Sequence, residues 1–398
     1  MNRVLVTDGH FRKTLAVVRS LGRRGVRVTV GERTFLNTSF FSKYCCQRMV
    51  YPSPSLFPEQ FIDFLLRELK KNHYGCLFPM EEETLLVVAR HQSEISKYTA
   101  LLIPDLAKIE FVRDKGNFLR YAEAHGIPVP KTYEALSSLV LPHQRGGESE
   151  GVPFSAIPIP AVIKPRISSG SFGIVYVKKE GDLLPSYLKV HQRYPFPLVQ
   201  EFIPDGGGTF GVSALFDERS NVKAAFVHKK LRMYPVQGGP STLREGVKHP
   251  LLMELGLSLL KSLKWVGVAM LEFKVDPRDG LPKLMELNPR FWGSLQLAIF
   301  SGVDFPYLML KIAKGEKFDP VLDYPAGRRS RWFLFGEILH FLNNPDRFRL
   351  QPSFFRFFEP NTCDDILSRD DPLPVLGAMA TFFTFLYDPE MKRFLERR

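Results

Sequence analysis

The stretch VAMLEFKVDPRDGLPKLMELNPR occupies residues 268–290, and its pattern predicts two antiparallel strands joined by a tight turn. Apolar and polar side chains alternate on both sides of the turn, which is the period of a strand. The residues between the strands include proline, aspartate and glycine, as turns require. A turn centred on Asp279 places Glu272 opposite Glu286 and puts Asn288 on the same face.

Two carboxylates on adjacent strands repel each other unless a cation lies between them. Glu272, Glu286 and Asn288 all offer oxygen ligands, which suit a Mg²⁺ ion that carries nucleotide phosphates. The pattern therefore indicates a metal site. The alternative is a solvated antiparallel pair with scattered charges, and a bulge in the turn would change the register.

A second motif joins a lysine to a loop of small residues. Lys164 ends an apolar strand, and the loop at 168–173 leads into another strand at 174–177. Small side chains let backbone N–H groups approach phosphate oxygens, and the lysine adds a positive charge. The spacing is not that of a P-loop. A hairpin turn without a ligand is the alternative.

A third motif is an apolar strand that ends in Gln200 and Glu201. Ile203, Asp205 and three glycines at 206–208 follow it. Such a strand can line an adenine slot, where edge amides read the base and a carboxylate reads the ribose. Taken alone, the segment is only a strand and a glycine-rich turn.

The first hundred residues alternate strands with helices and predict a parallel sheet with right-handed crossovers. We expect strands near 4–7, 26–30 and 75–79, and helices that follow residues 10 and 58 and span 81–95. The first turn does not match the Gly-x-Gly-x-x-Gly pattern, so a dinucleotide site there has little support.

We expect an α/β chain, with α+β character in its second part. Residues 1–112 form a Rossmann-like domain, residues 113–318 form a domain of two lobes (about 113–198 and 199–318), and residues 319–398 are a Phe-rich C-terminal extension. The segment 137–160 is rich in Gly, Pro and polar residues and is expected to run over the surface.

The composition excludes several classes of protein. The chain has 398 residues with 44% hydrophobic and 24% charged residues, which excludes wholesale disorder. No apolar run approaches the ~20 residues that span a bilayer, and the segment 375–387 predicts a buried helix. The four cysteines form neither a disulfide framework nor a zinc spacing, and the N-terminus lacks a signal-peptide pattern. We therefore expect a cytoplasmic protein.

Taken together and in this order, the motifs resemble the ATP-grasp superfamily. The matching stretches are VIKP (162–165) with the loop 168–173, VQEFIP (199–204), MLEF (270–273) and MELNPRFWGS (285–294). The last stretch looks most like the carbamoyl-phosphate-synthase type of this superfamily. The resemblance covers about residues 1–318, because the Rossmann-like part is similar to the pre-ATP-grasp domain of these proteins.

The resemblance implies a role for each matching position. Glu272, Glu286 and Asn288 would ligate one or two Mg²⁺ ions, or Mn²⁺, and Arg290 would stabilise an acyl phosphate with Lys164 as the second catalytic cation. The implied ATP contacts are Lys115, Lys164, Ser169, Gly170, Ser171, Gly173, Gln200, Glu201, Ile203 and Asp205. Many relatives carry an acidic residue within the glycine stretch. Here Asp205 precedes the glycines, which leaves ribose binding by this segment open.

Between these motifs lies a basic strand followed by a polar loop that contains glycine. A similar segment occurs in the same branch of the superfamily, which implies that Ser241 and Arg244 contact a substrate carboxylate. The alternative is a surface hairpin.

The C-terminal residues at 354–358 read Phe-Phe-Arg-Phe-Phe. Such a cluster suits a membrane surface or a protein partner, with arginines interleaved. Packing against the rest of the chain is the commoner fate of so many aromatic side chains.

The resemblance implies an ATP-dependent ligase that activates a small carboxylate as an acyl phosphate for attack by an amine or similar nucleophile. One alternative is an enzyme that forms a carbamate or carboxy-phosphate, and another is a noncatalytic ATP-binding regulatory module. The net charge of +12 is the sole feature of the sequence that favours a nucleic-acid partner. Because nothing else supports such a partner, we do not expect one. Many relatives are dimers, so a homodimer is a further expectation.

Overall fold

The computed structural model describes residues 2–133, 153–168, 170, 172–357 and 359–388. Most of the predicted surface segment at 137–160 lies outside the described residues, as do Ser169, Ser171 and Phe358. The chain forms two compact units. The first comprises Met1–Ile109, Phe210–Leu271 and Leu287–Glu396, and the second comprises mainly Glu110–Thr209 and Glu272–Glu286. The domain limits at 112, 198 and 318 stay a prediction.

A four-stranded parallel sheet with the order β3-β2-β1-β4 lies in the first unit. β1 (Arg3–Val6) pairs with both β2 (Arg27–Glu32) and β4 (Cys76–Phe78), so the first strand of the chain is central. The predicted Rossmann-like sheet is therefore confirmed. β3 (Cys45–Val50) also joins it, although its run of cysteines and polar residues carries no strand signal.

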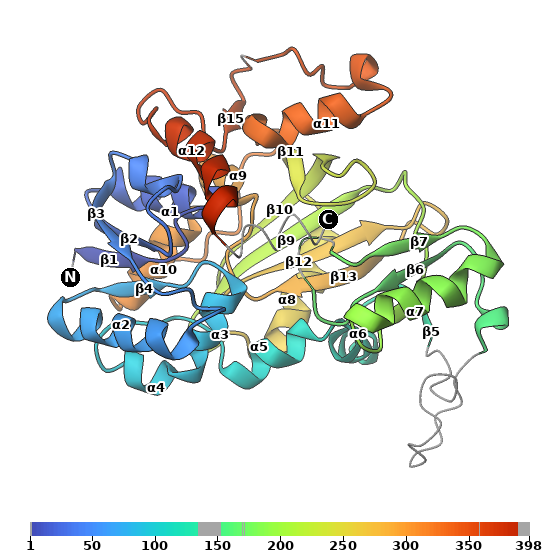
Figure 1. Ribbon diagram of the computed structural model, residues 1–398, viewed down its shortest axis with the longest axis horizontal. Helices are drawn as coiled ribbons and strands as arrows, with labels where there is room; N and C mark the ends of the chain where they lie inside the picture. The colour runs from blue at the N-terminus through green and yellow to red at the C-terminus, as the bar shows by residue number, and fades with distance from the viewer. Residues whose placement is uncertain (1, 134–152, 169, 171, 358, 389–398) are drawn as a thin grey trace. The chain divides into compact units, whose positions relative to one another are not determined.

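Helices alternate with these strands, as shown in blue and cyan in Figure 1. They are α1 (Arg12–Gly22), α2 (Pro58–Lys71), α3 (Glu82–Arg90), α4 (Gln92–Ile95) and α5 (Leu106–Arg113). α1 is buried on all sides from Lys13 to Leu21, and its buried residues include Leu15, Val18 and Leu21. The helix predicted over 81–95 is two helices, because the chain leaves helical geometry at His91.

A mixed sheet has the strand order β13-β12-β9-β10-β11-β14-β15. Its strands are β9 (Thr209–Phe216), β10 (Val222–Met233), β11 (Ser241–Gly246), β12 (Gly267–Val275), β13 (Pro282–Asn288), β14 (Arg329–Arg331) and β15 (Thr362–Asp364). The helices of this part of the sequence are α8 (Pro250–Ser262), α9 (Leu295–Phe300), α10 (Phe305–Ala313), α11 (Ile338–Asn343) and α12 (Pro374–Tyr387). β12 and β13 form the predicted pair of strands.

The second unit contains a sheet with the order β5-β8-β6-β7, in which the pairs are antiparallel. Its elements are α6 (Lys115–Ala124), β5 (Thr132–Tyr133), β6 (Ala161–Lys164), β7 (Val175–Val177), α7 (Leu183–Arg193) and β8 (Leu198–Glu201). α7 packs on β6 and β7 (Figure 1) and closes a small apolar core with them. The strands that carry Lys164 and Gln200 are thus direct neighbours.

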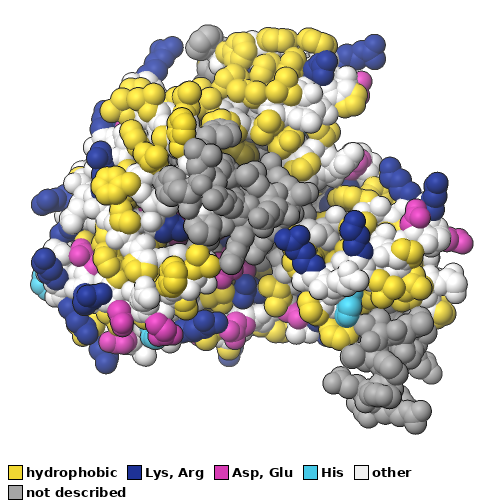
Figure 2. Space-filling view, in the orientation of Figure 1, with side chains coloured by type: hydrophobic (Ala, Val, Ile, Leu, Met, Phe, Trp, Pro, Cys, Tyr) yellow, Lys and Arg dark blue, Asp and Glu magenta, His cyan; other side chains and the backbone are white. Residues whose placement is uncertain are grey.

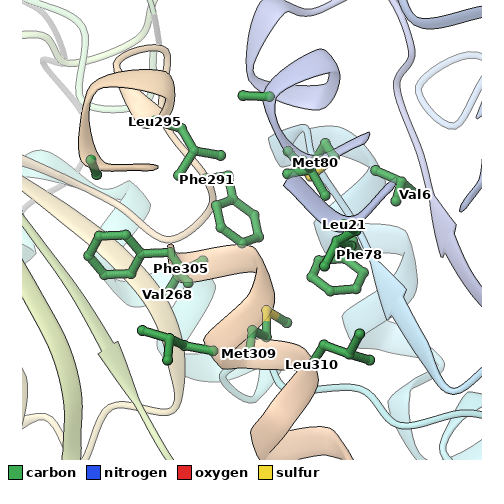
Figure 3. Close-up of a cluster of buried hydrophobic side chains, with 14 of the residues drawn as sticks. Val6, Leu21, Phe78, Met80, Val268, Phe291, Leu295, Phe305, Met309 and Leu310 are labelled. Atoms are coloured by element: carbon green, nitrogen blue, oxygen red, sulfur yellow. The ribbon is translucent and has the colours of Figure 1, made fainter. Parts of the chain in front are cut away.

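The main core of the first unit joins segments that are far apart in the sequence. Figure 3 shows Phe78 and Met80 from the N-terminal part beside Phe291, Phe305 and other apolar residues of the later chain. The rings of Phe78 and Phe291 stack with their centroids 6.2 Å apart. The segment that follows β13 is therefore anchored by apolar burial.

The C-terminal part departs from the prediction of a buried helix. α12 spans Pro374–Tyr387 as expected, but Leu376, Met379 and Phe383 are each more than half exposed along one side. Hydrophobic side chains gather over the region of α11 and α12 in Figure 2. Phe354 stacks on Phe341 of α11 with ring centroids 4.4 Å apart, so the phenylalanine cluster packs in part on this helix.

Candidate functional site

The β12–β13 turn is built around Asp276 and Gly280. The Asp276 amide donates to the Leu281 carbonyl oxygen (2.9 Å), and the Gly280 amide donates to the Asp276 carbonyl oxygen (2.8 Å). Gly280 has φ +71°, a left-handed conformation that glycine adopts without steric cost. Asp276 therefore bonds to two successive residues just before β13, which is the pattern of a bulged turn.

Burial does not alternate strictly along β13. Leu284 and Leu287 are buried, whereas Met285 and Glu286 between them are both half-buried. The alternation of buried side chains is therefore broken at this point. Glu286 and Asn288 occupy half-buried positions, as Glu272 does between two buried neighbours on β12.

Two lysines of the second unit lie at these glutamates. Lys115 Nζ is 3.8 Å from the Glu286 carboxylate and donates to the carbonyl oxygen of Ser168 at 2.6 Å. Lys164 Nζ lies 3.8 Å from Met285 Sδ, one residue before the same glutamate. The predicted phosphate-binding lysines and the predicted metal-binding glutamates are thus brought together within this unit.

The pKa of Lys164 is lowered by this environment. Burial lowers it from 10.5 to about 8, Lys115 and Lys274 lower it as well, and Glu286 and Glu272 oppose the shift. A half-buried ammonium with like charges nearby is poorly solvated. An anionic ligand that supplied new oxygen partners would relieve this cost, which is the property expected of a phosphate site.

The start of α6 is tied to the small-residue loop by contacts that the sequence did not predict. The Asp114 side chain accepts from the Asn117 amide and caps the helix, and it also pairs with Arg166 at 2.8 Å. The Lys115 amide donates to the Arg166 carbonyl oxygen at 3.0 Å. Lys115 is therefore held at both its backbone and its side chain.

The loop itself is described only in part. Gly170 and Gly173 both have positive φ, so the chain turns sharply at each. Ser169 and Ser171 lie outside the described residues, and their contact with phosphate stays a prediction.

The predicted adenine strand is β8, which pairs with β5 and β6. Gln200 is 1% exposed, and its side-chain amide donates to Thr132 Oγ1 at 2.8 Å. Glu201 accepts from the Lys131 amide and from Arg278, each at 2.9 Å. Both side chains already have protein partners, so any contact with a base would come mainly from the backbone at this edge.

The segment after β8 lies close to the end of β12. Lys274 Nζ donates to the Ile203 carbonyl oxygen and to the Asp205 carboxylate, both at 2.8 Å. A Cβ atom on Gly207 would lie 2.1 Å from the Val275 carbonyl oxygen, so only glycine fits there. The glycine stretch therefore serves this close approach, and ribose binding by Asp205 stays a prediction.

Arg290 follows β13 and lies in the first unit, where its partners come from the N-terminal part of the chain. Its Nε is 3.8 Å from the Glu81 carboxylate, and one terminal nitrogen donates to the Phe291 carbonyl oxygen at 3.0 Å. Glu81 also pairs with Lys13 at 2.7 Å. Neither Lys13 nor Glu81 belongs to a sequence motif, so sequence reasoning did not find them.

The predicted substrate contacts Ser241 and Arg244 lie on β11 of the first unit. Arg244 is fully buried and donates to Asp365, to Ser330 Oγ (2.7 Å) and to the Ser241 carbonyl oxygen (3.2 Å). Asp365 pairs in addition with Arg12 at 3.0 Å. This charge cluster accounts for the arginine without a ligand, and its contact with a substrate stays a prediction.

The residues present fit a hard cation. Two half-buried glutamates and an amide offer the oxygen ligands that Mg²⁺ takes together with phosphate oxygens. Among the described residues, no group of three or more His, Cys, Asp or Glu side chains is arranged to hold a metal by itself. The assignment of Glu272, Glu286 and Asn288 as metal ligands therefore stays a prediction.

Comparisons with known proteins agree with the architecture. Residues 217–332 match a family model described as "ATP-grasp in the biosynthetic pathway with Ter operon". A D-aspartate ligase of Enterococcus faecium (strain Aus0004) is 23% identical over 252 residues, and the match spans 58% of this chain and 58% of the ligase.

Two solved structures show the same fold at low identity. A biotin carboxylase from Campylobacter jejuni, in complex with β-γ-ATP, is 15% identical with a TM-score of 0.64, and the match covers 82% of this chain and 74% of the other. An L-amino acid ligase from Bacillus licheniformis is 16% identical with a TM-score of 0.58, covering 79% and 74%. The predicted ATP-grasp fold, with its Rossmann-like N-terminal sheet, is confirmed. No helix among the described residues is long and apolar enough to cross a membrane.

Proposed function

We propose that this chain, whose fold is that of the ATP-grasp superfamily, is an ATP-dependent ligase that joins a carboxylate to an amine. The observation that carries the proposal is the group formed by Lys115, Lys164, Glu272 and Glu286 in the second unit. Two cations for phosphate oxygens and two carboxylates for a divalent cation are what phosphoryl transfer from ATP requires.

The reaction would proceed in two displacements. A carboxylate oxygen of the first substrate attacks the γ-phosphorus of ATP, the bond to the β-phosphate oxygen breaks, and ADP leaves. The amine then attacks the acyl carbon, the bond to the phosphate oxygen breaks, and inorganic phosphate leaves as the new amide loses a proton to solvent. No covalent bond to the protein is needed.

The residues act mainly by placing charge. Lys115 and Lys164 would hold the phosphate oxygens, and their lysine charges oppose the negative charge that spreads over the transferred group. Mg²⁺, held by Glu272, Glu286 and Asn288, would supply further neutralisation of the phosphates when bound. Arg290 follows Glu286 by only four positions in the sequence, and we propose that it stabilises the acyl phosphate.

The named relatives favour amino acids as substrates. The E. faecium relative is a D-aspartate ligase, and one of the similar structures is an L-amino acid ligase. An amino acid carries the carboxylate and the amine that such a reaction needs. We propose an amino acid as at least one of the two substrates.

The second candidate is an enzyme that forms carboxy-phosphate from bicarbonate. The similarity to a biotin carboxylase favours it, since that protein's fold matches most of this chain. In this case bicarbonate takes the place of the organic carboxylate, and the same cations would serve.

The test is ADP release from Mg-ATP by the purified chain, with pools of amino acids and small carboxylates, and with bicarbonate in a separate arm. Glu286→Gln removes one proposed metal ligand, and Glu254→Gln on the exposed side of α8 is the matched control. Release that depends on an amino acid and disappears only in Glu286→Gln supports the ligase. Release with bicarbonate alone supports the second candidate. Tight ATP binding without turnover in any arm contradicts both and favours the regulatory module.

A further inference from the structure

The segment that carries Arg290 is fastened to the first helix of the chain. Arg12 Nε donates to the Gly293 carbonyl oxygen at 3.0 Å, and Lys13 Nζ donates to the Phe291 carbonyl oxygen at 3.1 Å. Both donors stand in the first turn of α1. Two long side chains from the N-terminal part therefore hold the backbone on the C-terminal side of Arg290.

Glu81 connects this attachment to the arginine itself. It follows β4, and its carboxylate lies 2.7 Å from Lys13 Nζ and 3.8 Å from Arg290 Nε. The Lys13 side chain is 4% exposed, that of Arg290 is 13% exposed and that of Glu81 is 23% exposed. The carboxylate thus lies between two largely buried cations.

The electrostatics agree with this geometry. Burial and the nearby Arg290 lower the pKa of Lys13 to about 8, while Glu81 opposes the shift. Burial raises the pKa of Glu81, but Lys13 and Arg290 together hold it below its usual value. Without the carboxylate, two cations would face each other in a poorly solvated place.

We propose that Glu81 and Lys13 are positioning residues for Arg290, which would hold its guanidinium in the orientation that meets the acyl phosphate. The proposal rests on the proposed function. A long arginine side chain free to rotate would have to be ordered at each turnover, whereas a guanidinium fixed in advance stabilises developing charge without that cost. The N-terminal part of the chain would then contribute to catalysis without touching the reacting atoms.

The kinetic test compares Glu81→Gln with Glu94→Gln, whose carboxylate forms an exposed pair with Lys70. We expect Glu81→Gln to lower kcat about tenfold to a hundredfold, as small misplacements of catalytic groups do, with Kd for ATP and KM for the other substrates within about twofold of the parent. Glu81→Asp, which keeps the charge, should restore part of kcat. A rise in KM with unchanged kcat would overturn the proposal.

A double-mutant cycle separates positioning from a role of Glu81 in its own right. Arg290→Met removes the side chain on which Glu81 is proposed to act. In that background Glu81→Gln should cause no further loss of kcat. An equal loss in both backgrounds would show that Glu81 acts independently and would overturn the proposal.

A readout that needs no turnover is the ¹⁵N–¹H resonance of Arg290 Nε, assigned by its disappearance in Arg290→Lys. This nitrogen is buried, so its proton is shielded from solvent. We expect the signal to shift or broaden in Glu81→Gln and in Lys13→Met, and to persist unchanged in Glu94→Gln. An unchanged signal in both variants would overturn the positioning role, whereas a changed signal in a protein without ligase activity would contradict only the proposed function.

Discussion

Lys115 Nζ lies 3.8 Å from a carboxylate oxygen of Glu286, so the first residue of α6 faces one of the two glutamates of the β12–β13 hairpin. The lysine is 8% exposed and donates at 2.6 Å to the carbonyl oxygen that begins the small-residue loop. One ammonium group thus links the helix, the loop and a predicted metal ligand of the same unit.

Lys115→Met should weaken ATP binding about tenfold to a hundredfold, because a charged hydrogen bond to phosphate is worth roughly 1.5–3 kcal/mol. Calorimetric titration with Mg-ATP measures the effect. Lys108→Met is the matched control, since Lys108 pairs with Asp105 on the surface of α5. Equal affinity in the two variants would remove Lys115 from the nucleotide site.

Asp365→Asn should destabilise the protein by about 3–5 kcal/mol, because it removes the charge that compensates two buried guanidinium groups. Asp365 is 1% exposed and pairs with Arg12 and with the fully buried Arg244. Urea denaturation measures the loss. In the control Asp323→Asn, which breaks an exposed pair with Lys248, the unfolding midpoint should stay unchanged. A midpoint for Asp365→Asn equal to that of the control would contradict the prediction.

The contribution of Glu32 to the stability of the protein should fall as the pH rises from about 4.5 to about 6. Burial raises the pKa of this carboxyl group from 4.5 to about 6, so the folded chain keeps a proton that the unfolded chain has already lost. Deprotonation of the Glu32 carboxyl group in this range therefore raises the free energy of the folded state relative to the unfolded state. Glu32→Gln has no such titration, so its free energy of unfolding should fall by about 2 kcal/mol less over this range. Denaturation of both proteins at several pH values measures the difference, and parallel curves would contradict it.

Gly207→Ala should destabilise the protein by about 1–3 kcal/mol, since the new Cβ would lie 2.1 Å from the Val275 carbonyl oxygen and the backbone would have to move. Gly181→Ala is the control, because a Cβ there meets no atom within 4 Å. Thermal unfolding of the two variants gives the comparison. If both melt at the same temperature, the close approach to β12 does not constrain this turn.

Local patterns were enough to predict the β12–β13 hairpin, the strand that ends at Lys164 and the parallel sheet around β1. Each depends on the period of side chains within a few residues, or on glycine and proline at turns, and both are properties of short segments. The same patterns predicted the extent of α12 but not its exposed side, because burial depends on what lies against a helix.

The irregularities of the β12–β13 hairpin could be found only in the folded chain. A bulged turn lies at Gly280, and the alternation of buried side chains along β13 is broken at Met285 and Glu286, which are both half-buried. Alternation along one strand does not reveal an extra residue in the partner strand, because the signal lies in hydrogen bonds across the pair.

The order of amino acids by itself determined the alternation of strands and helices and the short motifs at Lys164, Glu272, Glu286 and Arg290, because both are properties of contiguous segments. Only the tertiary structure decided that Arg244 is enclosed with Asp365 and that Lys13 and Glu81 surround Arg290. These partners come from segments far apart along the chain. Folding brings them together because the helices and strands that carry them bury their apolar surfaces against one another.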